Sequence, residues 1–241
     1  MELLVVGAGA IGRWLGATVD AELAFTDVDP EAARTAADDA GGEAVPIDGD
    51  ERFDAVAVAV PMPVAADAIE THAPRARDAM LDLTGSMVEP VNLMAEHAGD
   101  RERLSLHPLF APVNAPGHIA MVPAAPGPVA GRIHDDLEAA GNDLFETSAE
   151  AHDQAMETVQ AKTHAAVLAF ALAADEVDPA FATPVFEQLT ELVEEVTDGH
   201  SRVYADIQEV FNGAEAVAEA AELVAEADRE RFEQLFRDAG E

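Results

Sequence analysis

The sequence MELLVVGAGAIGRWLG, residues 1–16, places a short apolar run directly before Gly7, Gly9 and Gly12, and a helical pattern after them. In a strand–turn–helix unit the first glycine permits the tight turn, the second lets a pyrophosphate approach the backbone, and the third lets the helix pack on the strand. Free N–H groups at the start of the helix would face the phosphates. The stretch predicts a dinucleotide-binding site; a glycine-rich turn without a ligand is the alternative.

The next apolar run, LAFTD, ends at Asp27, twenty residues after Gly7. A carboxylate here suits the 2′-hydroxyl of a ribose and would repel a 2′-phosphate, so we expect the cofactor NAD rather than NADP. Arg13 lies in the first turn of the predicted helix, where a cation opposes the helix dipole. Contact with the pyrophosphate would explain this cation, and a solvated surface arginine is the alternative.

The composition is strongly acidic, with 48 Asp and Glu against 13 Lys and Arg and a formal net charge of −35. Such a charge excludes nucleic acid as a partner and strains a fold by self-repulsion unless salt screens it. We therefore expect a halophilic protein. Apolar residues make up 49% and recur with helix and strand periods, so the charge does not indicate disorder.

The chain has no cysteine, so it can build neither a disulfide framework nor a thiolate metal site, and we assign it no metal. The first residues lack a basic region before the apolar run, and no apolar stretch is long enough to span a bilayer. We expect a cytoplasmic protein without membrane contact.

Apolar runs and helical patterns alternate over residues 1–147, which is typical of an α/β Rossmann fold with a doubly wound parallel sheet. The predicted strands are Leu3–Val6, Leu23–Thr26, Ala55–Val60, Met80–Leu83, Leu104–Leu106, Ile119–Val122 and Asp143–Glu146. The predicted helices between them are Ala10–Val19, Glu31–Ala40, Val64–His72 and Val129–Ala140.

From residue 148 the chain changes to Ala-rich, acid-studded amphipathic patterns, which predict a smaller all-α domain over residues 148–241. Its predicted helices are Ala149–Ala174, Phe181–Thr197, Ser201–Phe211 and Ala214–Ala239. A chain of 241 residues can hold this domain beside a dinucleotide domain over residues 1–147.

Two polar segments follow predicted strands at the edge where ligands bind in such sheets. In DLTGS, residues 82–86, the chain breaks at a glycine and presents the Ser86 hydroxyl. In SLHP, residues 105–108, the proline holds His107 extended at the end of its strand. Because histidine is the usual side chain for proton transfer near neutral pH, we expect His107 to be catalytic; a structural histidine is the alternative.

Two further candidates lie in the helical part. His164 falls on the same helical stripe as Gln160 and Leu168, where it is either a core histidine or a substrate ligand. Arg202 opens another predicted helix and could hold a carboxylate with its bidentate fork, and a capped surface turn is the alternative.

Taken in order, GAGAIGRWLG, DLTGS, SLHPLF, DQAMETVQAKTHAAVLAFAL and VYADIQ resemble the prephenate dehydrogenase family, in its archaeal form, over nearly the whole chain. The resemblance implies NAD-dependent oxidative decarboxylation of prephenate to 4-hydroxyphenylpyruvate in tyrosine biosynthesis, and a homodimer that interlocks through the helical domain. It also implies that His107 and Ser86 are catalytic and that His164 binds substrate. Family members often carry a substrate-binding arginine about nine residues before the aromatic of the YADI-like segment, where this chain has Glu195, and Arg202 is the candidate to replace it.

Three alternatives stay open, because fold alone does not decide function. An arogenate-using member of the same family would show the same motifs. Another Rossmann reductase with a helical dimer domain, such as an imine or deazaflavin-linked reductase, would keep the glycines and Asp27 but would not need a base at His107. A non-catalytic NAD-sensing protein would retain the fold alone.

Overall fold

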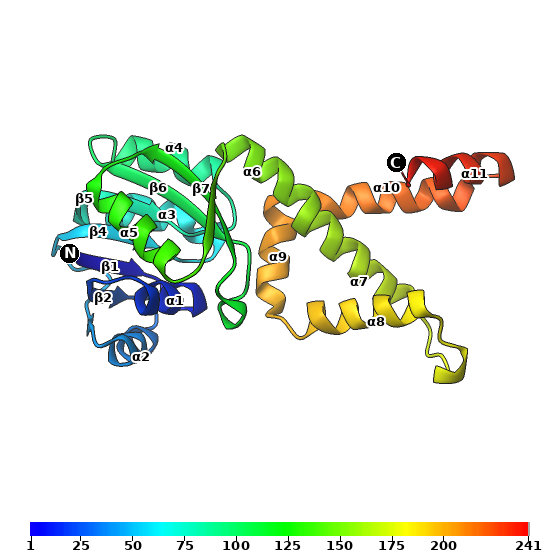
Figure 1. Ribbon diagram of the computed structural model, residues 1–241, viewed down its shortest axis with the longest axis horizontal. Coiled ribbons are helices and arrows are strands. Elements are labelled where there is room, and N and C mark those ends of the chain that lie inside the picture. The colour runs from blue at the N-terminus through cyan, green and yellow to red at the C-terminus, as the bar shows by residue number, and fades with distance from the viewer. Residues whose placement is uncertain (241) are drawn as a thin grey trace. The chain divides into compact units, whose positions relative to one another are not determined.

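An eight-stranded sheet organises the first of two units into which the chain divides after Asp153 (Figure 1). The computed structural model describes residues 1–240. The strands are β1 (Glu2–Val6), β2 (Glu22–Thr26), β3 (Glu43–Ala44), β4 (Phe53–Val58), β5 (Ala76–Asp82), β6 (Glu102–Pro108), β7 (His118–Ala125) and β8 (Asp143–Glu146). Their order in the sheet is β3-β2-β1-β4-β5-β6-β7-β8.

The sheet is parallel from β3 to β6, and β7 then pairs antiparallel to β6. A parallel neighbour needs a crossover of a dozen or more residues, usually a helix. Only residues 109–117 connect β6 to β7, so the chain turns back beside β6. The predicted doubly wound fold is therefore confirmed with one departure, an antiparallel pair toward the β8 edge.

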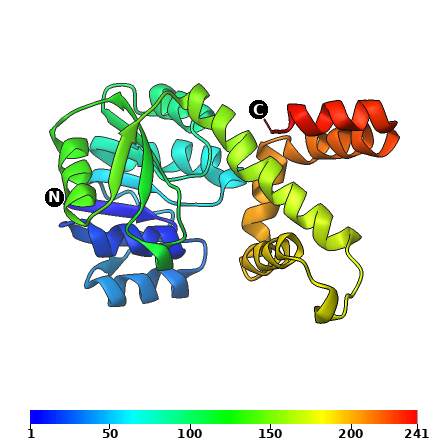
Figure 2. The same cartoon turned by 45° about the vertical axis from the view of Figure 1, so that its right-hand side comes forward.

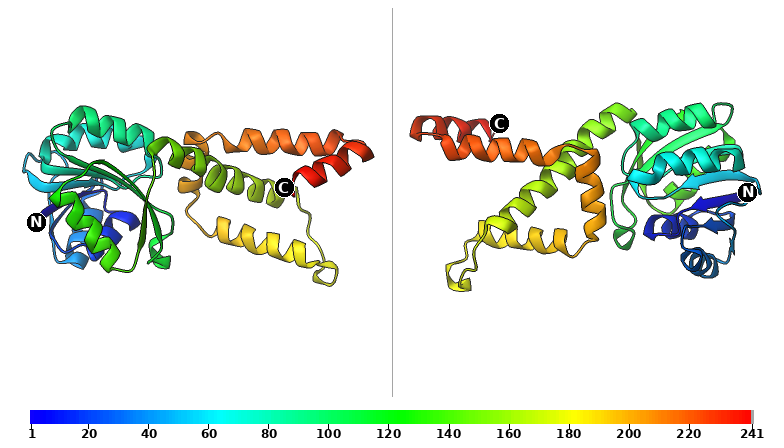
Figure 3. Two further views of the ribbon diagram at one scale, coloured as in Figure 1. Left: turned by 45° about the horizontal axis from the view of Figure 1, so that its top comes forward. Right: turned by 180° about the vertical axis from the view of Figure 1, so that it is seen from behind.

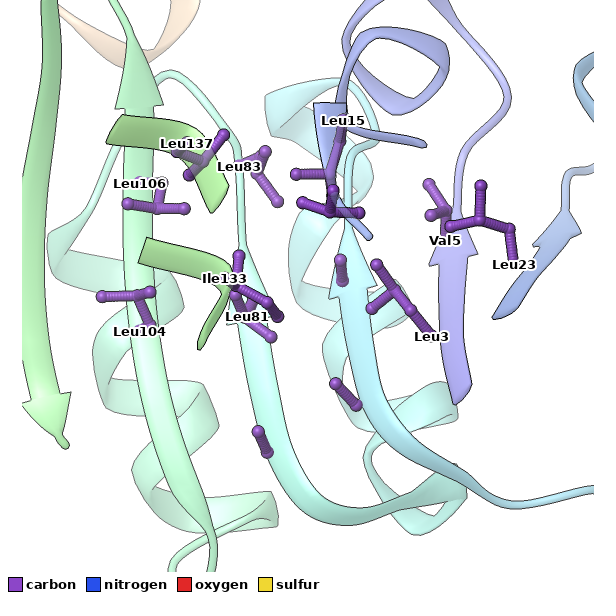
Figure 4. Packing of buried hydrophobic residues seen from close by; sticks show 14 of the residues in the cluster. Leu3, Val5, Leu15, Leu23, Leu81, Leu83, Leu104, Leu106, Ile133 and Leu137 are labelled. Carbon is purple, nitrogen blue, oxygen red and sulfur yellow. The ribbon is translucent and has the colours of Figure 1, made fainter. Parts of the chain in front are cut away.

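The central strands are buried on both faces, which is why they read as continuous apolar runs. Successive residues of β1 point to opposite faces, so Leu3 and Val5 enter one core cluster while Leu4 and Val6 enter another. Figure 4 shows the first cluster, in which Leu15 and Ile133 of two covering helices pack on the sheet.

Helices cover both faces of this sheet (Figure 3). The helices of this unit are α1 (Ala10–Thr18), α2 (Pro30–Ala40), α3 (Ala65–His72), α4 (Val88–His97) and α5 (Pro128–Ala139), and α6 (Ala149–Met156) begins at its end. Helices α1, α2 and α5 contribute buried residues to the first cluster, and α3 and α4 contribute Ile69 and Met94 to the second. Our sequence reading missed α4 and the two-residue strand β3.

The second unit, from Gln154, consists of helices joined by loops and has no strand among its described residues (Figure 2). After α6 come a π-helical segment, η4 (Glu157–Lys162), and the helices α7 (Thr163–Ala173), α8 (Pro184–Thr197), α9 (Ser201–Val210), α10 (Gly213–Glu226) and α11 (Arg229–Asp238). The predicted single helix over Ala214–Ala239 is wrong. Asp228 caps α11 by accepting a hydrogen bond from the Arg231 N–H at 2.9 Å, and this cap starts a new helix.

Within residues 1–240, no helix is both long and apolar enough to cross a membrane.

Candidate active site

The turn after β1 is shaped by its three glycines, each for a different reason. Gly7 has φ +102°, and a Cβ there would overlap the carbonyl oxygen of Ala59. A Cβ on Gly12 would overlap the carbonyl oxygen of Gly7, so α1 approaches the turn closely. Nothing lies within 4 Å of the Cβ position of Gly9. This turn therefore offers an open backbone surface, beside the start of α1, that suits a phosphate group.

Asp27, which follows β2, lies against the same turn. Its carboxylate accepts a hydrogen bond from the Ala8 N–H at 2.7 Å and another from the Asp29 N–H at 2.9 Å. The side chain is half-buried, and each carboxylate oxygen can accept one further hydrogen bond. Asp27 is thus held at the glycine turn with acceptor capacity left for hydroxyl groups.

Arg13 also reaches this turn, where its Nε donates to the carbonyl of Ala8 at 2.9 Å. Its guanidinium forms an ion pair with Asp39 of α2 at 3.6 Å, and the side chain is 39% exposed. Arg13 therefore lies near the proposed phosphate site, but its guanidinium is already paired with the Asp39 carboxylate.

His107 is the last residue but one of β6, at the carboxyl-terminal edge of the sheet that also carries the glycine turn. It is buried, and its Nδ1 lies 2.9 Å from Nε2 of His152. Nδ1 of His152 in turn lies 2.8 Å from Oδ1 of Asp153. The Asp153 carboxylate also accepts hydrogen bonds from the N–H groups of Met87 at 2.9 Å and Val88 at 3.0 Å. These contacts form a row, His107–His152–Asp153, in which the two histidines are buried and Asp153 is half-buried.

Local packing brings His152 to His107. Ser148 accepts a hydrogen bond from the Ala151 N–H at 3.1 Å and so caps the start of α6. Ala149 packs with Met87 and with Ala120, the residue of β7 that pairs with His107. One helical turn later, His152 reaches the imidazole of His107. Sequence reasoning missed His152 because the chain contains a second His-Asp pair, at residues 134–135, and nothing local distinguishes the two.

Burial and the neighbouring His152 lower the pKa of His107 to about 3, although the Asp153 charge acts in the opposite direction. The His107 ring is therefore neutral near pH 7 and can accept a proton.

Near this row, the end of β5 holds a fully buried acid, Asp82, that sequence reasoning did not single out. Asp82 accepts hydrogen bonds from the Ser105 hydroxyl at 2.9 Å and the Thr84 N–H at 3.1 Å, and burial raises its pKa to about 7. Ser86 is buried in the following loop, where its carbonyl accepts from the Thr84 hydroxyl at 3.1 Å. Because Ser86 directly precedes Met87, which donates to Asp153, it belongs to the same neighbourhood as the histidine row.

The segment after His107 packs against helix α1. Phe110 packs edge-on against Trp14 of α1, with ring centroids 5.4 Å apart at 82°. The glycine turn, Ser86 and His107 therefore lie along one edge of a single unit, where ligands bind in doubly wound sheets.

The remaining predicted site residues belong to the helical unit. His164 of α7 is half-buried and stacks edge-on with Tyr204 of α9, with ring centroids 4.7 Å apart. Its Nδ1 is buried without a hydrogen-bond partner in the described structure, and so are the side-chain carbonyl oxygens of Gln160 and Gln208. Unpaired buried polar atoms beside a π-helical segment are typical of functional sites.

Arg202 and Glu195 are both exposed in the helical unit. Within residues 1–240, the Arg202 guanidinium has no hydrogen-bond or ion-pair partner among protein groups. Burial, with a smaller contribution from the Glu195 charge, raises the pKa of Tyr204. The only lysine, Lys162, pairs with Glu157 at 2.7 Å and is not available as a free cation.

The strand order, the glycine turn and the neutral histidine at the same edge define a Rossmann-type fold with a dehydrogenase-like site. No family model matches the chain. It is 32% identical to the 4-amino-4-deoxyprephenate dehydrogenase of Streptomyces pristinaespiralis, over 97% of this chain and 88% of that protein. The chain therefore belongs to the prephenate dehydrogenase family of oxidoreductases.

A probable arogenate/prephenate dehydrogenase of Methanocaldococcus jannaschii is 25% identical over 80% of this chain, which spans 48% of that protein. Among solved structures, the prephenate dehydrogenase of A. aeolicus in complex with hydroxyphenyl propionate and NAD+ superimposes with a TM-score of 0.72 at 17% identity, over 99% of this chain and 96% of that chain. The arogenate dehydrogenase of Synechocystis gives a TM-score of 0.65 at 13% identity, over 100% of this chain and 98% of that chain. These structures share the fold.

Proposed function

We propose that the protein catalyses the NAD-dependent oxidative decarboxylation of prephenate to 4-hydroxyphenylpyruvate, in tyrosine biosynthesis. The observation that carries the proposal is the neutral, buried His107 at the sheet edge that also holds the glycine turn. Membership of the prephenate dehydrogenase family narrows the substrate to a cyclohexadiene acid of the prephenate type.

NAD fits the residues at the turn. The open space beside Gly9 leaves room for a pyrophosphate, and Gly7 and Gly12 let the backbone and α1 approach it. Asp27 would hold the ribose hydroxyls, and Arg13 is the nearest candidate for a phosphate contact, at the expense of its pair with Asp39. When bound, NAD accepts the hydride that leaves the substrate's ring carbon.

His107 would take the proton of the ring hydroxyl as that hydride departs, and Ser86 would orient the same hydroxyl. The substrate carbonyl so formed draws the electron pair released when carbon dioxide leaves, and the ring becomes aromatic. His107 can then return its proton to the phenolate oxygen. The protein therefore needs to supply one base, the role proposed for His107, and correct orientation, to which Ser86 would contribute.

The substrate is a dianion, and a protein with a net charge of −35 repels it unless cations gather locally. We assign the cationic role to Arg202 and a hydrogen bond to the substrate to His164, because burial lowers the pKa of His164 and favours its neutral ring. Both residues belong to the helical domain, residues 148–241, and we assign the cofactor to residues 1–147. The buried, unpartnered Nδ1 of His164 and the unpaired guanidinium of Arg202 in the described structure support the assignment.

We also propose a homodimer formed through the helical domain. Leu172 is 89% exposed, Phe181 78% and Phe236 74% in this unit. Apolar side chains with this exposure are available for burial in an interface. A second copy of the chain is the partner that the family resemblance implies.

A second candidate function follows from the relative in S. pristinaespiralis, whose named substrate carries an amino group in place of the ring hydroxyl. The same base could deprotonate either group. Arogenate, which has an amino acid in place of the keto acid, is the third candidate, since the relative in M. jannaschii is named for both acids.

The deciding experiment mixes purified protein in molar potassium chloride with NAD and each of the three substrates in turn. With prephenate we expect reduced nicotinamide, carbon dioxide and 4-hydroxyphenylpyruvate in equal amounts, and we expect the highest kcat/KM of the three substrates. The matched variant His107→Asn should lower kcat by about 10²–10⁴ with little change in NAD affinity. Bound NAD without reduction by any substrate would instead favour the NAD-sensing alternative.

A further inference from the structure

The contact between His107 and His152 is a hydrogen bond whose direction the geometry alone leaves open, since either imidazole nitrogen can carry the proton. That direction decides the chemistry. If Nδ1 of His107 donates, its Nε2 has a free lone pair and can act as a base. If Nδ1 accepts, Nε2 carries the proton and cannot.

The other end of the row determines the protonation of His152. Asp153 receives two backbone N–H groups, from Met87 and Val88, in addition to His152. Burial acts to raise the pKa of Asp153, but the hydrogen bonds from His152, Val88 and Met87 outweigh it and lower the pKa. Asp153 is therefore an anion that only accepts hydrogen bonds, so Nδ1 of His152 must donate.

With its proton on Nδ1, a neutral His152 presents the lone pair of Nε2 to His107. His152 is 3% exposed, and a second proton, on Nε2, would place a charged imidazolium in a buried site. Nδ1 of His107 then donates to His152. Nε2 of His107 has no hydrogen-bond partner within residues 1–240, so it is the atom left for a ligand.

We propose that His152 and Asp153 are positioning residues that hold His107 as the Nδ1–H tautomer, so that Nε2 of His107 receives the substrate's proton. The proposal rests on the proposed function for the identity of that proton. Asp153 adds a fixed negative charge at the far end of the row, which stabilises the imidazolium formed as His107 takes the proton. The Met87 and Val88 N–H groups keep this charge in place at the start of α4.

The direct test is nitrogen NMR of protein with isotope-labelled histidine, recorded without substrate, with His107→Asn and His152→Gln used to assign the two rings. The proposal requires a protonated Nδ1 and an unprotonated Nε2 on both His107 and His152. A proton on Nε2 of His107, or a doubly protonated His152, would overturn it. This measurement needs no enzymatic turnover.

Two variants at one position provide the kinetic test. A glutamine at position 152 has a donor for Asp153 and an acceptor for His107, whereas leucine has neither. We expect His152→Leu to lower kcat by at least about 10-fold, within the range a general base supplies, with KM and NAD affinity unchanged, and His152→Gln to recover most of the loss. Equal kcat in both variants would contradict a positioning role.

His72→Leu, which removes a different buried histidine of the same unit, is the control and should leave kcat unchanged. The two proposals can fail separately. Inactivity toward all three substrates with the required tautomer present would reject the proposed function alone, and an active enzyme with the opposite tautomer would reject the positioning role alone.

Discussion

At the scale of single residues, the carboxylate of Asp27 decides which nucleotide the glycine turn would accept. It is anchored by the Ala8 and Asp29 N–H groups and so cannot swing away from a bulky 2′-phosphate. We predict that kcat/KM with NAD exceeds that with NADP at least about tenfold, or about 1.4 kcal/mol.

Steady-state kinetics with both nucleotides measure this preference, and Asp27→Asn, which removes the charge at nearly constant size, should reduce it. Equal use of NAD and NADP by the unchanged protein would contradict the role assigned to Asp27.

The burial of His72 predicts that the stability of the fold depends on pH. His72 is buried in α3, its Nδ1 has no partner in the described structure, and burial together with the Arg75 charge lowers its pKa to about 4. The unfolded chain takes up this proton near pH 6.5, whereas the folded protein resists it. The stability that depends on a neutral His72 is therefore present above about pH 6.5 and is lost as pH falls toward 4, by up to about 3 kcal/mol.

Urea unfolding at pH 7 and at pH 4.5, in molar salt, measures the effect. The difference in unfolding free energy between the unchanged protein and His72→Leu should shift by about 2–3 kcal/mol in favour of the variant at the lower pH. Because Asp82 and His107 titrate in both proteins, their contributions cancel in this difference. A difference that does not change with pH would show that His72 is protonated equally in both states.

At the scale of elements, helix α9 presents Arg202 in its first turn, exposed and without an acidic partner among the described residues. If this arginine replaces the family's arginine, it binds a substrate carboxylate equally in the ground state and the transition state. We predict that Arg202→Ala raises the substrate KM more than it lowers kcat.

The matched control is Arg229→Ala, which removes another exposed first-turn arginine, that of α11. Arg229→Ala should change neither KM nor kcat. An unchanged KM in Arg202→Ala would assign the substrate carboxylate to a different residue.

At the scale of the whole molecule, 48 acids cannot be paired with 13 bases, so repulsion acts among the excess charges. The Debye length is about 30 Å at 0.01 M salt and about 3 Å at 1 M. In molar salt each charge therefore interacts only with its nearest neighbours, whereas in dilute salt charges repel one another across the whole molecule. We predict loss of the dimer and then of the fold as potassium chloride is removed, with activity rising toward molar salt.

Circular dichroism and light scattering on serial dilution follow the two losses. Sodium chloride at the same ionic strength is the control, because it screens charge equally and should restore the dimer to the same extent. A folded dimer at low millimolar salt would show that core packing outweighs the repulsion.

The sequence by itself predicted the alternating strands and helices of the first unit, the glycine turn, the change to an all-helical second unit and the position of His107 at a strand end. These features depend on signals carried by neighbouring residues: apolar periodicity, the spacing of Gly7, Gly9 and Gly12, and a proline after a histidine. The family resemblance rests on the same local motifs in order, and the relative with 32% identity confirms it.

Only the tertiary structure placed His152 against His107, 45 residues away in the chain, and gave Asp82 its partner Ser105 on the next strand. It also turned β7 antiparallel and divided the last predicted helix at Asp228. Contacts of this kind depend on which strands pair and on how α6 packs against Met87 and Ala120, so no local pattern encodes them. The protonation states that would make His107 a base depend on burial and on neighbours distant in sequence, which exist only in the folded chain.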